Sequence, residues 1–548
     1  MKVKTIFFIV ILNLTGGFVI GQQLVKDIYS GSTSSLSIYP FPFCTSNGVF
    51  FFSAYGSNDV GSELWKSDGT AAGTVLVKDI ATGTNPSYVN FLTNVNGTLF
   101  FRACTDGNNS TYELWKSDGT TEGTNMIKDI RVGQQGSNPQ NFIELNGNLF
   151  FTADDGINGE ELWKSDGTTA GTVMVNDIYA GSIGSTPKYL TLYNNELYFQ
   201  AHGGFVSPSS GETLWKTDGT TLGTVMVTTT NKPGFPEEFL VSNNLLFFSA
   251  KSSTSGRELW KTDGTSSGTA VVKDINVGAF TSSFPQKLID VDGQLMFFAN
   301  DGINGSELWK SDGTAAGTLL IKDINTGATG SFVNTVPNDF TRCVIGNQLY
   351  FRADDGVNGA ELWKTDGTSS GTVMLKNIYP GANSSLPNAL INFNGKLIFS
   401  ANNDLYGTEL YQSDGSAAGT TLITDINAGL GSSTPYAMHI FNSNLYFAAS
   451  TSALGTEIWR YTGSPLLNNS FANEKISIYP NPASTILNIK LTDNSTIEHL
   501  TISDLSGKKI IEQKSNQTFI NVEGLAQGIY VLEVIANGNK LTNKFIKE

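Results

Sequence analysis

The chain has 548 residues and a formal net charge of −15, with 34 Lys and Arg against 49 Asp and Glu. No basic stripe interrupts this acidic background, so nucleic acid and anionic lipid are excluded as expected partners, because both are bound through clustered Lys and Arg. A chain of this length is normally divided into several domains, unless an internal repeat builds one larger unit.

Residues 1–21 have the pattern of a signal peptide. The basic start MKVK precedes the largely apolar run IFFIVILNLTGGFVIG, which ends among small residues. We predict cleavage between Gly21 and Gln22. A membrane anchor is the alternative, but Asn13, Thr15 and two glycines interrupt the run, whereas a span needs about 20 apolar residues. No later segment is apolar enough to span, so we expect no membrane span in the mature protein.

Residues 22–463 contain nine copies of one motif, spaced 45 to 54 residues apart. A period of this size is typical of solenoids, propellers and repeat arrays. Every tryptophan of the chain stands at the same position of the motif, and Tyr411 takes that position in one copy. The tryptophans are Trp65, Trp115, Trp163, Trp215, Trp260, Trp309, Trp363 and Trp459.

Each copy predicts four short antiparallel strands. The first two flank an Asn-Gly pair or a variant of it, which suits a type I′ turn because both central residues need positive φ. ELWK at 63–66 is a third strand, and the loop SDGTAAGT returns the chain into a fourth, VLVKDI, at 75–80. Four such strands form one propeller blade. The predicted turns are Asn47-Gly48, Asn96-Gly97, Asn146-Gly147, Asp292-Gly293, Asn394-Gly395, Asn194-Asn195 and Asn243-Asn244.

The two ends of the repeat region complement each other. The mature chain starts with LVKDI at 24–28, and the last copy stops after EIWRYTG at 457–463 without its Asp-Gly-Thr loop. If the ring closes, residues 24–28 pair beside 456–461 and complete the last blade, whereas a linear solenoid would need polar caps. The predicted fold is therefore all-β: a β-propeller of about nine four-stranded repeats, with eight as the alternative, closed by the N-terminal strand.

One copy, around residues 202–240, departs from the motif. Thr213 replaces the usual Glu, the loop at 203–212 is lengthened, and the Lys-Asp-Ile signature is lost. Such an irregular blade is either tolerated drift or a functional insertion, and the sequence alone favours drift.

The core ELWKSDGTAAGT resembles the bacterial ELWxxDGT repeat family, and the resemblance extends over residues 22–463. Departures from the family pattern are Thr213 for Glu, Tyr411 for Trp, and residues 460–462, RYT, in place of Lys-Ser-Asp. The family label implies no common activity.

After a linker at 464–474, residues 475–548 alternate apolar and polar positions between glycine turns, which predicts a small Ig-like β-sandwich. Four spaced stretches there resemble the type A sorting domain of the type IX secretion system of Bacteroidota; an adhesive Ig-like module is the alternative. The resemblance implies the type IX machinery as a partner and a secreted or outer-membrane surface-attached protein. The stretches are Tyr479-Pro480-Asn481-Pro482, Asp504-Leu505-Ser506-Gly507-Lys508, Gly528-Ile529-Tyr530 and Lys544-Phe545-Ile546.

Residues able to carry catalysis are few. His202, His439 and His499 are the only histidines, and none lies in a motif for a Ser-His-Asp triad or a zinc site. Most acidic residues recur in every copy, whereas an active site requires a break in symmetry. We therefore predict no catalytic residue, no bound cofactor and no enzymatic activity. The cysteines, which are expected to be buried free thiols rather than a disulfide framework, are Cys44, Cys104 and Cys343.

Two loops are weak candidates for calcium, because each offers two carboxylates and one amide oxygen. Their spacing does not match an EF-hand loop, and turn formation alone accounts for the same residues. The candidate ligands are Asp154, Asp155, Asn158, Asp354, Asp355 and Asn358.

The repeated side chains have structural interpretations. Tryptophan is expected to pack between blades, since nine copies in one place suit packing better than ligand stacking. Glu63 and Lys66 flank Leu-Trp, and Lys78 and Asp79 lie on the facing strand, so the pattern allows cross-strand Lys-Asp or Glu-Lys pairs. The loops between second and third strands and the loops that join one blade to the next must share one face of the disk. Because these loops vary, that face is the candidate binding surface.

The sequence as a whole predicts an exported β-propeller that binds a glycan or a protein without catalysis. One alternative is an enzyme that acts on polysaccharide through loop carboxylates. A second alternative is a structural surface-coat protein.

Overall fold

The computed structural model describes residues 22–36, 43–56, 60–203, 211–227, 233–252, 254–278, 280–333, 341–463, 476–491, 496–503, 509–514, 517–536 and 539–547. These residues contain strands and turns but no helix, so the chain is all-β as predicted. They divide into two compact units, one spanning Gly21–Tyr461 and one containing Thr462–Glu548.

The larger unit consists of nine four-stranded antiparallel sheets among its described residues, one for each predicted repeat. Within each sheet the strands follow chain order, because tight turns and short loops connect them, and only the last sheet recruits a strand from far away. Sheets 1 to 4 are β2–β5, β6–β9, β10–β13 and β14–β17: β2(Cys44–Ser46), β3(Val49–Tyr55), β4(Ser62–Ser67), β5(Val75–Lys78), β6(Asn90–Val95), β7(Thr98–Ala103), β8(Glu113–Ser117), β9(Asn125–Lys128), β10(Gln140–Leu145), β11(Asn148–Asp154), β12(Glu160–Ser165), β13(Val173–Asn176), β14(Lys188–Tyr193), β15(Glu196–Ala201), β16(Thr213–Thr217) and β17(Val225–Met226).

Sheets 5 to 9 repeat the same order of strands. They are β18–β21, β22–β25, β26–β29, β30–β33, and β34–β36 with β1: β18(Gly234–Ser242), β19(Leu245–Lys251), β20(Arg257–Thr262), β21(Ala270–Lys273), β22(Gln286–Val291), β23(Gln294–Asn300), β24(Ser306–Ser311), β25(Leu319–Lys322), β26(Arg342–Ile345), β27(Gln348–Asp354), β28(Ala360–Thr365), β29(Val373–Lys376), β30(Asn388–Phe393), β31(Lys396–Asn403), β32(Gly407–Ser413), β33(Thr421–Thr424), β34(Tyr436–Phe441), β35(Asn444–Thr451), β36(Gly455–Tyr461) and β1(Gln22–Lys26).

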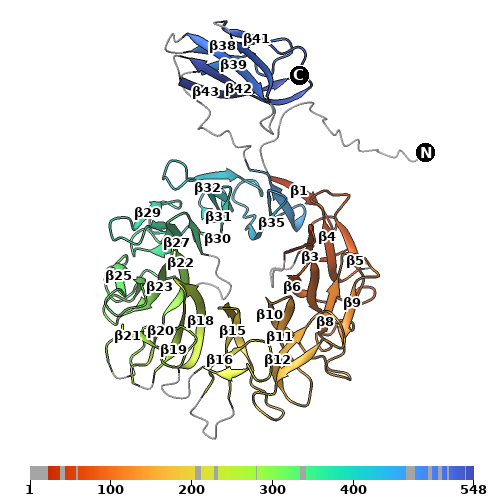
Figure 1. Cartoon of the computed structure of the whole chain (residues 1–548), viewed down its shortest axis with the longest axis vertical. Helices are drawn as coiled ribbons and strands as arrows, with labels where there is room; N and C mark the ends of the chain where they lie inside the picture. Colours follow the sequence, from red (N-terminus) through yellow and green to blue (C-terminus); the bar gives the residue numbers. More distant parts are fainter. Residues whose placement is uncertain are drawn as a thin grey trace, which may run out of the picture. The chain divides into compact units, whose positions relative to one another are not determined.

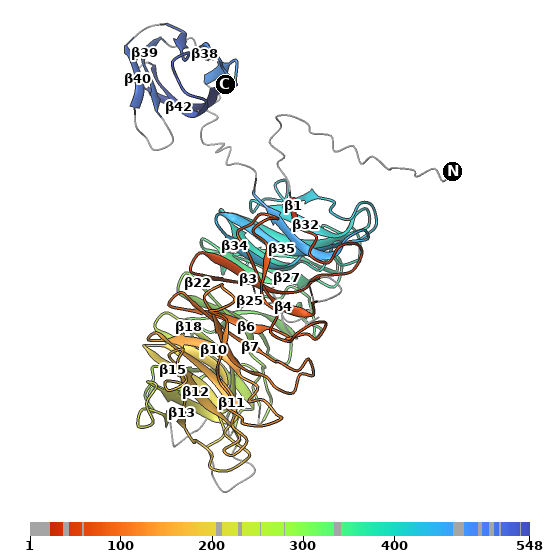
Figure 2. The same ribbon diagram turned by 90° about the vertical axis from the view of Figure 1, so that its right-hand side faces the viewer.

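The sheets are arranged around a centre in chain order, from red through yellow and green to blue (Figure 1). The first strands of consecutive sheets lie next to one another, as β2 does beside β6 and β30 beside β34. We call these first strands the inner strands. Figure 2 shows the same arrangement from the side. The order and the neighbouring inner strands are propeller-like.

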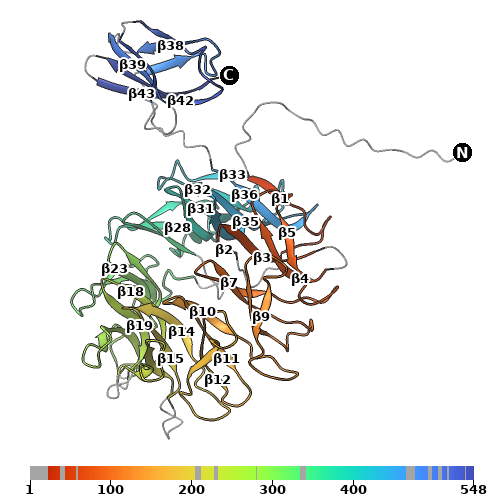
Figure 3. The same ribbon diagram turned by 45° about the vertical axis from the view of Figure 1, so that its right-hand side comes forward.

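Sheet 9 is completed by the start of the chain. β1 pairs antiparallel with β36, with Gln22 opposite Tyr461 and Leu24 opposite Trp459. The two strands lie side by side in Figure 3. The predicted pairing is confirmed, although the strand begins at Gln22 and ends at Lys26 instead of covering residues 24–28.

The core lies between sheets, because consecutive strand residues project from opposite faces. Leu64 packs with Phe101 and Trp115 of sheet 2, whereas Trp65 packs on the other face with Tyr446 of sheet 9. The prediction that the repeated tryptophan packs between repeats is therefore confirmed. Each sheet contributes to the cores on both of its faces, so no sheet could be stable alone.

The turns between first and second strands have the predicted backbone. Asn96 and Gly97 have φ of 49° and 84°, as a type I′ turn requires. The variant turn Asn194-Asn195 adopts the same region, with φ of 50° and 64°. Asparagine tolerates this left-handed conformation better than most residues.

The C-terminal unit consists of two sheets that share one hydrophobic core. Leu487 and Ile489 of the first sheet pack with Leu500 and Leu532 of the second. The first sheet consists of β37(Ile476–Tyr479), β38(Ile486–Leu491) and β41(Phe519–Asn521), and the second of β40(Lys509–Lys514), β39(Ile497–Ser503), β42(Gly528–Ala536) and β43(Asn539–Lys547).

The described residues of the two units contain no helix able to cross a bilayer.

Candidate functional site

The repeated Glu before Leu-Trp binds the backbone of the loop that joins its sheet to the next. The buried carboxylate of Glu63 accepts hydrogen bonds from the N–H groups of Ile80, Ala81 and Ser87, at 2.9, 3.3 and 3.0 Å. The expected pairing of this Glu with a cross-strand Lys is therefore wrong: the loop's unpaired N–H groups take its oxygens. The equivalent residues are Glu113, Glu161, Glu258, Glu307, Glu361, Glu409 and Glu457.

Burial determines the ionisation of these carboxyl groups. It raises the pKa of Glu63, Glu258 and Glu457 to about 7, against the opposing effect of the hydrogen bonds that each accepts. Burial also raises the pKa of the other five, Glu113, Glu161, Glu307, Glu361 and Glu409.

Lysine side chains link most sheets to the next. Lys66 Nζ donates to the carbonyl oxygen of Gly119 at 2.8 Å, and Lys78 Nζ donates to that of Thr124 at 2.6 Å. The same two links join sheet 9 to sheet 1, where Arg460 donates to Gly69 O at 3.3 Å and Lys26 to Thr74 O at 2.6 Å. We call the contact between sheets 9 and 1 the closing join. Its links match those between sheets that are consecutive in sequence.

Sheet 4 departs from this pattern. Thr213 stands in place of the Glu, and its hydroxyl donates to the carbonyl oxygen of Pro233 at 3.1 Å. Lys216 pairs with Glu196 of its own sheet at 3.0 Å instead of reaching sheet 5. We call the contact between sheets 4 and 5 the Thr213 join; within the described ranges it has neither lysine link. Sheet 8 also lacks both lysines, but sheet 9 has no Asp-Gly-Thr loop to receive the first link.

A pocket of about 210 Å³ opens beside the Thr213 join, at the start of three inner strands. Polar groups are part of the lining: Arg257 Nη1 is 2.9 Å from Glu237 Oε1, and Glu238 Oε2 accepts the N–H of Lys287 at 2.9 Å. Two aromatic side chains also line the pocket and remain accessible, Tyr189 at 46 % and Phe284 at 58 % exposure.

The charged groups of this pocket are partly withdrawn from water. The Arg257 side chain is only 9 % exposed and also donates to Ser249 O at 3.2 Å. Burial raises the pKa of Glu237, with Arg257 opposing and Glu238 adding to the shift. Burial likewise raises the pKa of Tyr189. Perturbed ionisable groups with accessible aromatic rings are typical of ligand sites.

Sequence reasoning missed these residues, although the signal was present. The segment PGFPEEFL at 233–240 puts two adjacent carboxylates into an inner strand, and it follows directly on the copy that lacks Glu. The pocket lies on the predicted binding face, because Arg257 follows a loop between second and third strands and Phe284 ends a loop between sheets. Of the lengthened loop at 203–212, residues 204–210 lie outside the described part.

The two calcium candidates form closed turns. Asp155 Oδ1 accepts the N–H groups of Ile157 and Asn158, both at 2.8 Å, and Oδ2 accepts Asn158 Nδ2 at 2.7 Å. Asp154 pairs with Arg131 at 2.5 Å. In the second loop Asp355 binds Val357 and Asn358 in the same way, and Asp354 Oδ1 accepts the N–H of Gly356. Over the described ranges, no cluster of three or more His, Cys, Asp or Glu side chains is placed to hold a metal ion.

The other singled-out residues are dispersed. Cys44 and Cys104 are buried and Cys343 is half-buried, all as free thiols. His202, His439 and His499 belong to different sheets or loops. His439 contacts Thr45, and His499 contacts Glu512.

The sorting-motif residues lie at the ends of the C-terminal strands. Asn481 Oδ1, between Pro480 and Pro482, accepts the N–H of Ile546 at 2.8 Å. Tyr530 follows Gly528 at the start of β42, stacks on Phe545 and donates to Ala526 O at 3.0 Å. Tyr479 ends β37 and is 53 % exposed, and the backbone of Lys544 pairs with Val531. Residues 504–508, the linker 464–474 and Gly21 lie outside the described residues, whereas Gln22 begins β1.

Comparison with known proteins identifies the C-terminal unit. Residues 477–548 match the secretion system C-terminal sorting domain family. This domain belongs to type IX secretion, so the chain interacts with that machinery and is exported, either secreted or attached to the cell surface. No curated protein matches the whole sequence.

Solved structures resemble the chain only distantly. A puromycin hydrolase is 14 % identical over 64 % of this chain and 56 % of its own length, with a TM-score of 0.37. A prolyl endopeptidase is 12 % identical over 82 % and 54 %, with a TM-score of 0.36. PorZ, a surface component of the type IX secretion system of Porphyromonas gingivalis, is 10 % identical over 96 % and 100 %, with a TM-score of 0.23.

These comparisons correct one prediction. Two of the similar structures are a hydrolase and an endopeptidase, so the expectation that the chain is not an enzyme is contradicted and is withdrawn. The chain spans little more than half the length of either enzyme. With TM-scores below 0.5, neither assigns an activity to this chain.

Proposed function

We propose that residues 22–463 form a closed nine-bladed β-propeller of the ELWxxDGT type, which binds a glycan at the pocket beside the Thr213 join. The protein enters the export route through its N-terminal signal peptide and completes it through an Ig-like sorting domain, as in Bacteroidota. The cargo carried to the cell exterior is the propeller.

Closure is supported by contacts that repeat around the unit. The pairing of β1 with β36 supplies the missing fourth strand, and the Lys26 and Arg460 links reproduce those of consecutive sheets. Phe52 of sheet 1 packs in one core with Ala448 and Ile458 of sheet 9. A linear array would leave these apolar faces in water.

The glycan assignment rests on one observation: the pocket combines accessible aromatic faces with an ordered carboxylate–guanidinium pair. Sugars present apolar C–H faces and several hydroxyl groups, so they need both kinds of surface within one small site. Tyr189 and Phe284 offer the flat surfaces. Glu238 and Arg257, which bond to backbone groups, and Glu237, which pairs with Arg257, offer acceptors and donors. A nucleic acid would meet two carboxylates here.

The test is a glycan array with the mature protein, followed by calorimetry with the glycan that binds most tightly. Phe284→Ala is expected to weaken binding by about tenfold, because it removes one aromatic face. Phe280→Ala is the matched control, since Phe280 is also exposed on the same connecting loop but does not line the pocket. Equal losses in both variants, or no bound glycan, would contradict the proposal. Binding of a protein instead would identify the other class of ligand.

A second candidate function is hydrolysis of polysaccharide in the same pocket. Glu237 and Glu238 are adjacent carboxylates, and the raised pKa of Glu237 suits a proton donor. A reducing-sugar assay with the glycans that bind on the array tests for this hydrolysis. If the wild type releases reducing sugar and Glu237→Gln does not, the protein is a glycoside hydrolase. If the glycan binds and no sugar is released, recognition is the function.

A further inference from the structure

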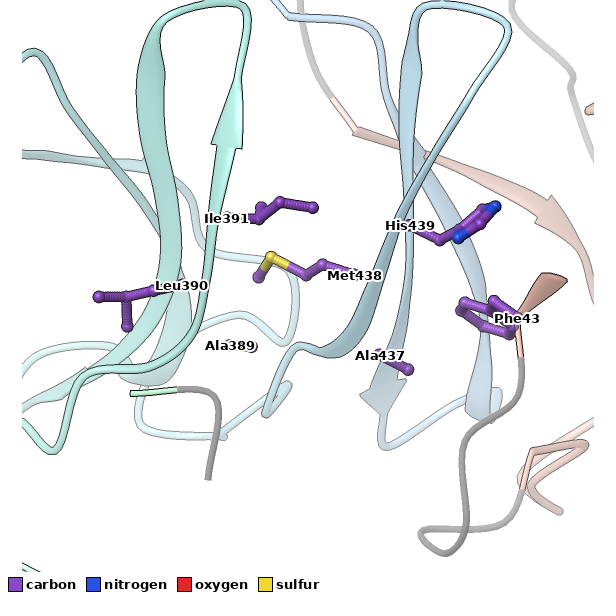
Figure 4. Close-up of a pocket in the computed structure, with 7 residues that line it drawn as sticks. All are labelled: Phe43, Ala389, Leu390, Ile391, Ala437, Met438 and His439. Atoms are coloured by element: carbon purple, nitrogen blue, oxygen red, sulfur yellow. The ribbon is translucent and has the colours of Figure 1, made fainter. Parts of the chain in front are cut away.

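A second pocket lies on the inner strands at a different part of the unit. It has a volume of about 320 Å³ and is lined by residues of β30, β34 and the residue before β2. Figure 4 shows the seven lining residues: Phe43, Ala389, Leu390, Ile391, Ala437, Met438 and His439. None of them lines the pocket beside the Thr213 join.

Small side chains at one repeated position make this space. Most of the described inner strands, though not β2 or β26, have a residue with positive φ in their first half. In β6 this residue is Phe91 and in β14 it is Tyr189, with φ of 54° and 58°. In β30 and β34 the same position is Ala389 and Ala437, both with φ of 52°. Between β6 and β10 the gap is filled by the rings of Phe91 and Phe142, whose centroids are 5.6 Å apart. Ala389 and Ala437 thus leave open a space that larger side chains fill elsewhere in the unit.

The pocket has an aliphatic part and an aromatic part. Ile391 and Met438 face each other between β30 and β34, and His439 and Phe43 face each other on the opposite side of β34 (Figure 4). The thioether of methionine adapts to ligands of varied shape. No charged side chain is among the described lining residues. A charged ligand would therefore lose its hydration without compensation, and a neutral one is favoured.

His439 is the polar anchor. Its Nε2 lies 2.8 Å from Thr45 Oγ1, and its ring stacks on Phe50 with centroids 5.3 Å apart. These contacts hold the imidazole in place and leave its second nitrogen, Nδ1, without a hydrogen-bond partner among the described residues. Nδ1 is a donor or an acceptor according to the tautomer that Thr45 selects, and a hydroxyl group satisfies both. Burial lowers the pKa of His439 and keeps the ring neutral at pH 7.

We propose that this pocket binds a neutral alkyl-substituted phenol group, with the hydroxyl at His439, the ring beside Phe43 and the alkyl part between Ile391 and Met438. The volume lies at the small end of ligand pockets, which fits one substituted ring. Sugars are disfavoured, because six of the seven lining side chains offer no polar atom that donates or accepts strongly.

Calorimetry of the full chain with 4-ethylphenol tests the proposal. We expect saturable binding, and binding about tenfold weaker for 4-ethylanisole, in which a methyl group replaces the hydroxyl hydrogen. N-acetyl-tyrosinamide tests whether a peptide can supply the phenol group. Its binding, if weakened by the same pocket variants, would support a tyrosine side chain as the ligand. No saturation by 4-ethylphenol at about 1 mM, or equal binding of 4-ethylanisole, would overturn the proposal.

Two variants locate the bound molecule. Ala437→Phe fills the space with the side chain that β6 carries at the same backbone conformation, and it is expected to weaken 4-ethylphenol binding at least tenfold. His439→Leu replaces the polar anchor with an apolar side chain, so it should weaken 4-ethylphenol binding and leave 4-ethylanisole binding unchanged. Tyr189→Ala, in the other pocket, is the control and should change neither. Unaltered binding in both Ala437→Phe and His439→Leu would place the phenol elsewhere and refute the site.

Discussion

The closing join and the Thr213 join have similar apolar packing but different polar contacts. Phe52 and Tyr446 pack across the first, and Tyr198 and Trp260 across the second. The closing join has both basic links to sheet 1. It also has the Glu457 contact with residues 28–35, which connects residues more than 400 positions apart. The Thr213 join connects neighbouring repeats and lacks all three within the described residues. Chain continuity thus permits the loss of contacts that a join between distant segments needs.

The difference has a thermodynamic reason. Joining the chain's first strand to its last sheet closes a very long loop, which costs conformational entropy. Hydrogen bonds that fix the segment after β1 offset this cost. Between sheets 4 and 5 the connecting loop already keeps the partners close, so Thr213 and the diverted Lys216 are tolerated there. The segment at 233–240, which lacks the usual contact with a Glu of the preceding sheet, contributes Glu237 and Glu238 to the polar pocket.

Raising the pH should have the largest effect on stability. It should also reduce the difference between the two joins, because the Glu contact is present only at the closing join. Burial raises the folded-state pKa of the eight Glu groups above the ordinary value near 4.5, and raises that of Glu63, Glu258 and Glu457 to about 7. The contribution of these groups to stability is therefore complete below about pH 4.5 and is lost as the pH rises through the folded-state pKa, which is about 7 for these three. We expect the melting temperature to fall by several degrees between about pH 5.5 and pH 8.5, measured by calorimetry. A rising melting temperature would contradict this assignment.

Removing Glu457 should weaken the closing join. Glu457→Ala removes the acceptor of the Ile28 N–H and of the Ser35 hydroxyl, so we expect a loss of about 2 to 3 kcal/mol in the free energy of unfolding at pH 6. Glu63→Ala removes equivalent contacts within a continuous segment and is the matched control. Only Glu457→Ala should speed amide exchange in β1. Equal exchange of β1 in the two variants would show that the closing join does not depend on this contact.

Hydrogen exchange of the wild type should show directly which of the two joins opens more readily. We expect amides of β17 and the start of β18 to exchange about tenfold faster than those of β1 and β36, because the Thr213 join has fewer polar links. The measurement is mass-spectrometric exchange at pH 7. Faster exchange in β1 would reverse the order of the joins.

The smallest expected effect concerns single lysines. Lys116→Ala removes a 2.8 Å hydrogen bond to Gly167 O across a join and should cost about 1 kcal/mol in chemical unfolding. Lys216→Ala removes a partly exposed pair within sheet 4 and should cost less than about 0.5 kcal/mol. A larger loss for Lys216→Ala would mean that this lysine does stabilise the Thr213 join.

Most of the fold was predictable because the repeat is local. Asn-Gly turns, aromatic second strands and the Asp-Gly-Thr loop each specify their own backbone, and nine copies made the strand order unambiguous. The missing outer strand of the last copy also predicted the β1–β36 pairing. The role of Glu63 was not predictable from strand alternation, since its partners are loop N–H groups rather than a facing side chain.

The pockets illustrate the opposite case. Tyr189, Glu237 and Phe284 are separated by up to 95 residues in sequence and come together only because three inner strands begin side by side. Ala389 and Ala437 are unremarkable as residues, and only their register shows that they replace Phe91 and Tyr189. The signal peptide, the calcium candidates and the ligand class stay predictions.

The amino-acid sequence by itself determined the strands, the turns, the number of repeats and the export domain, because each depends on interactions between residues near one another or on a contiguous motif. The tertiary structure alone decided which residues line the inner strands and which contacts carry each join, because these depend on packing between sheets. The single Thr213 copy, which the sequence presents as drift, lies beside a pocket lined by two carboxylates and a guanidinium group.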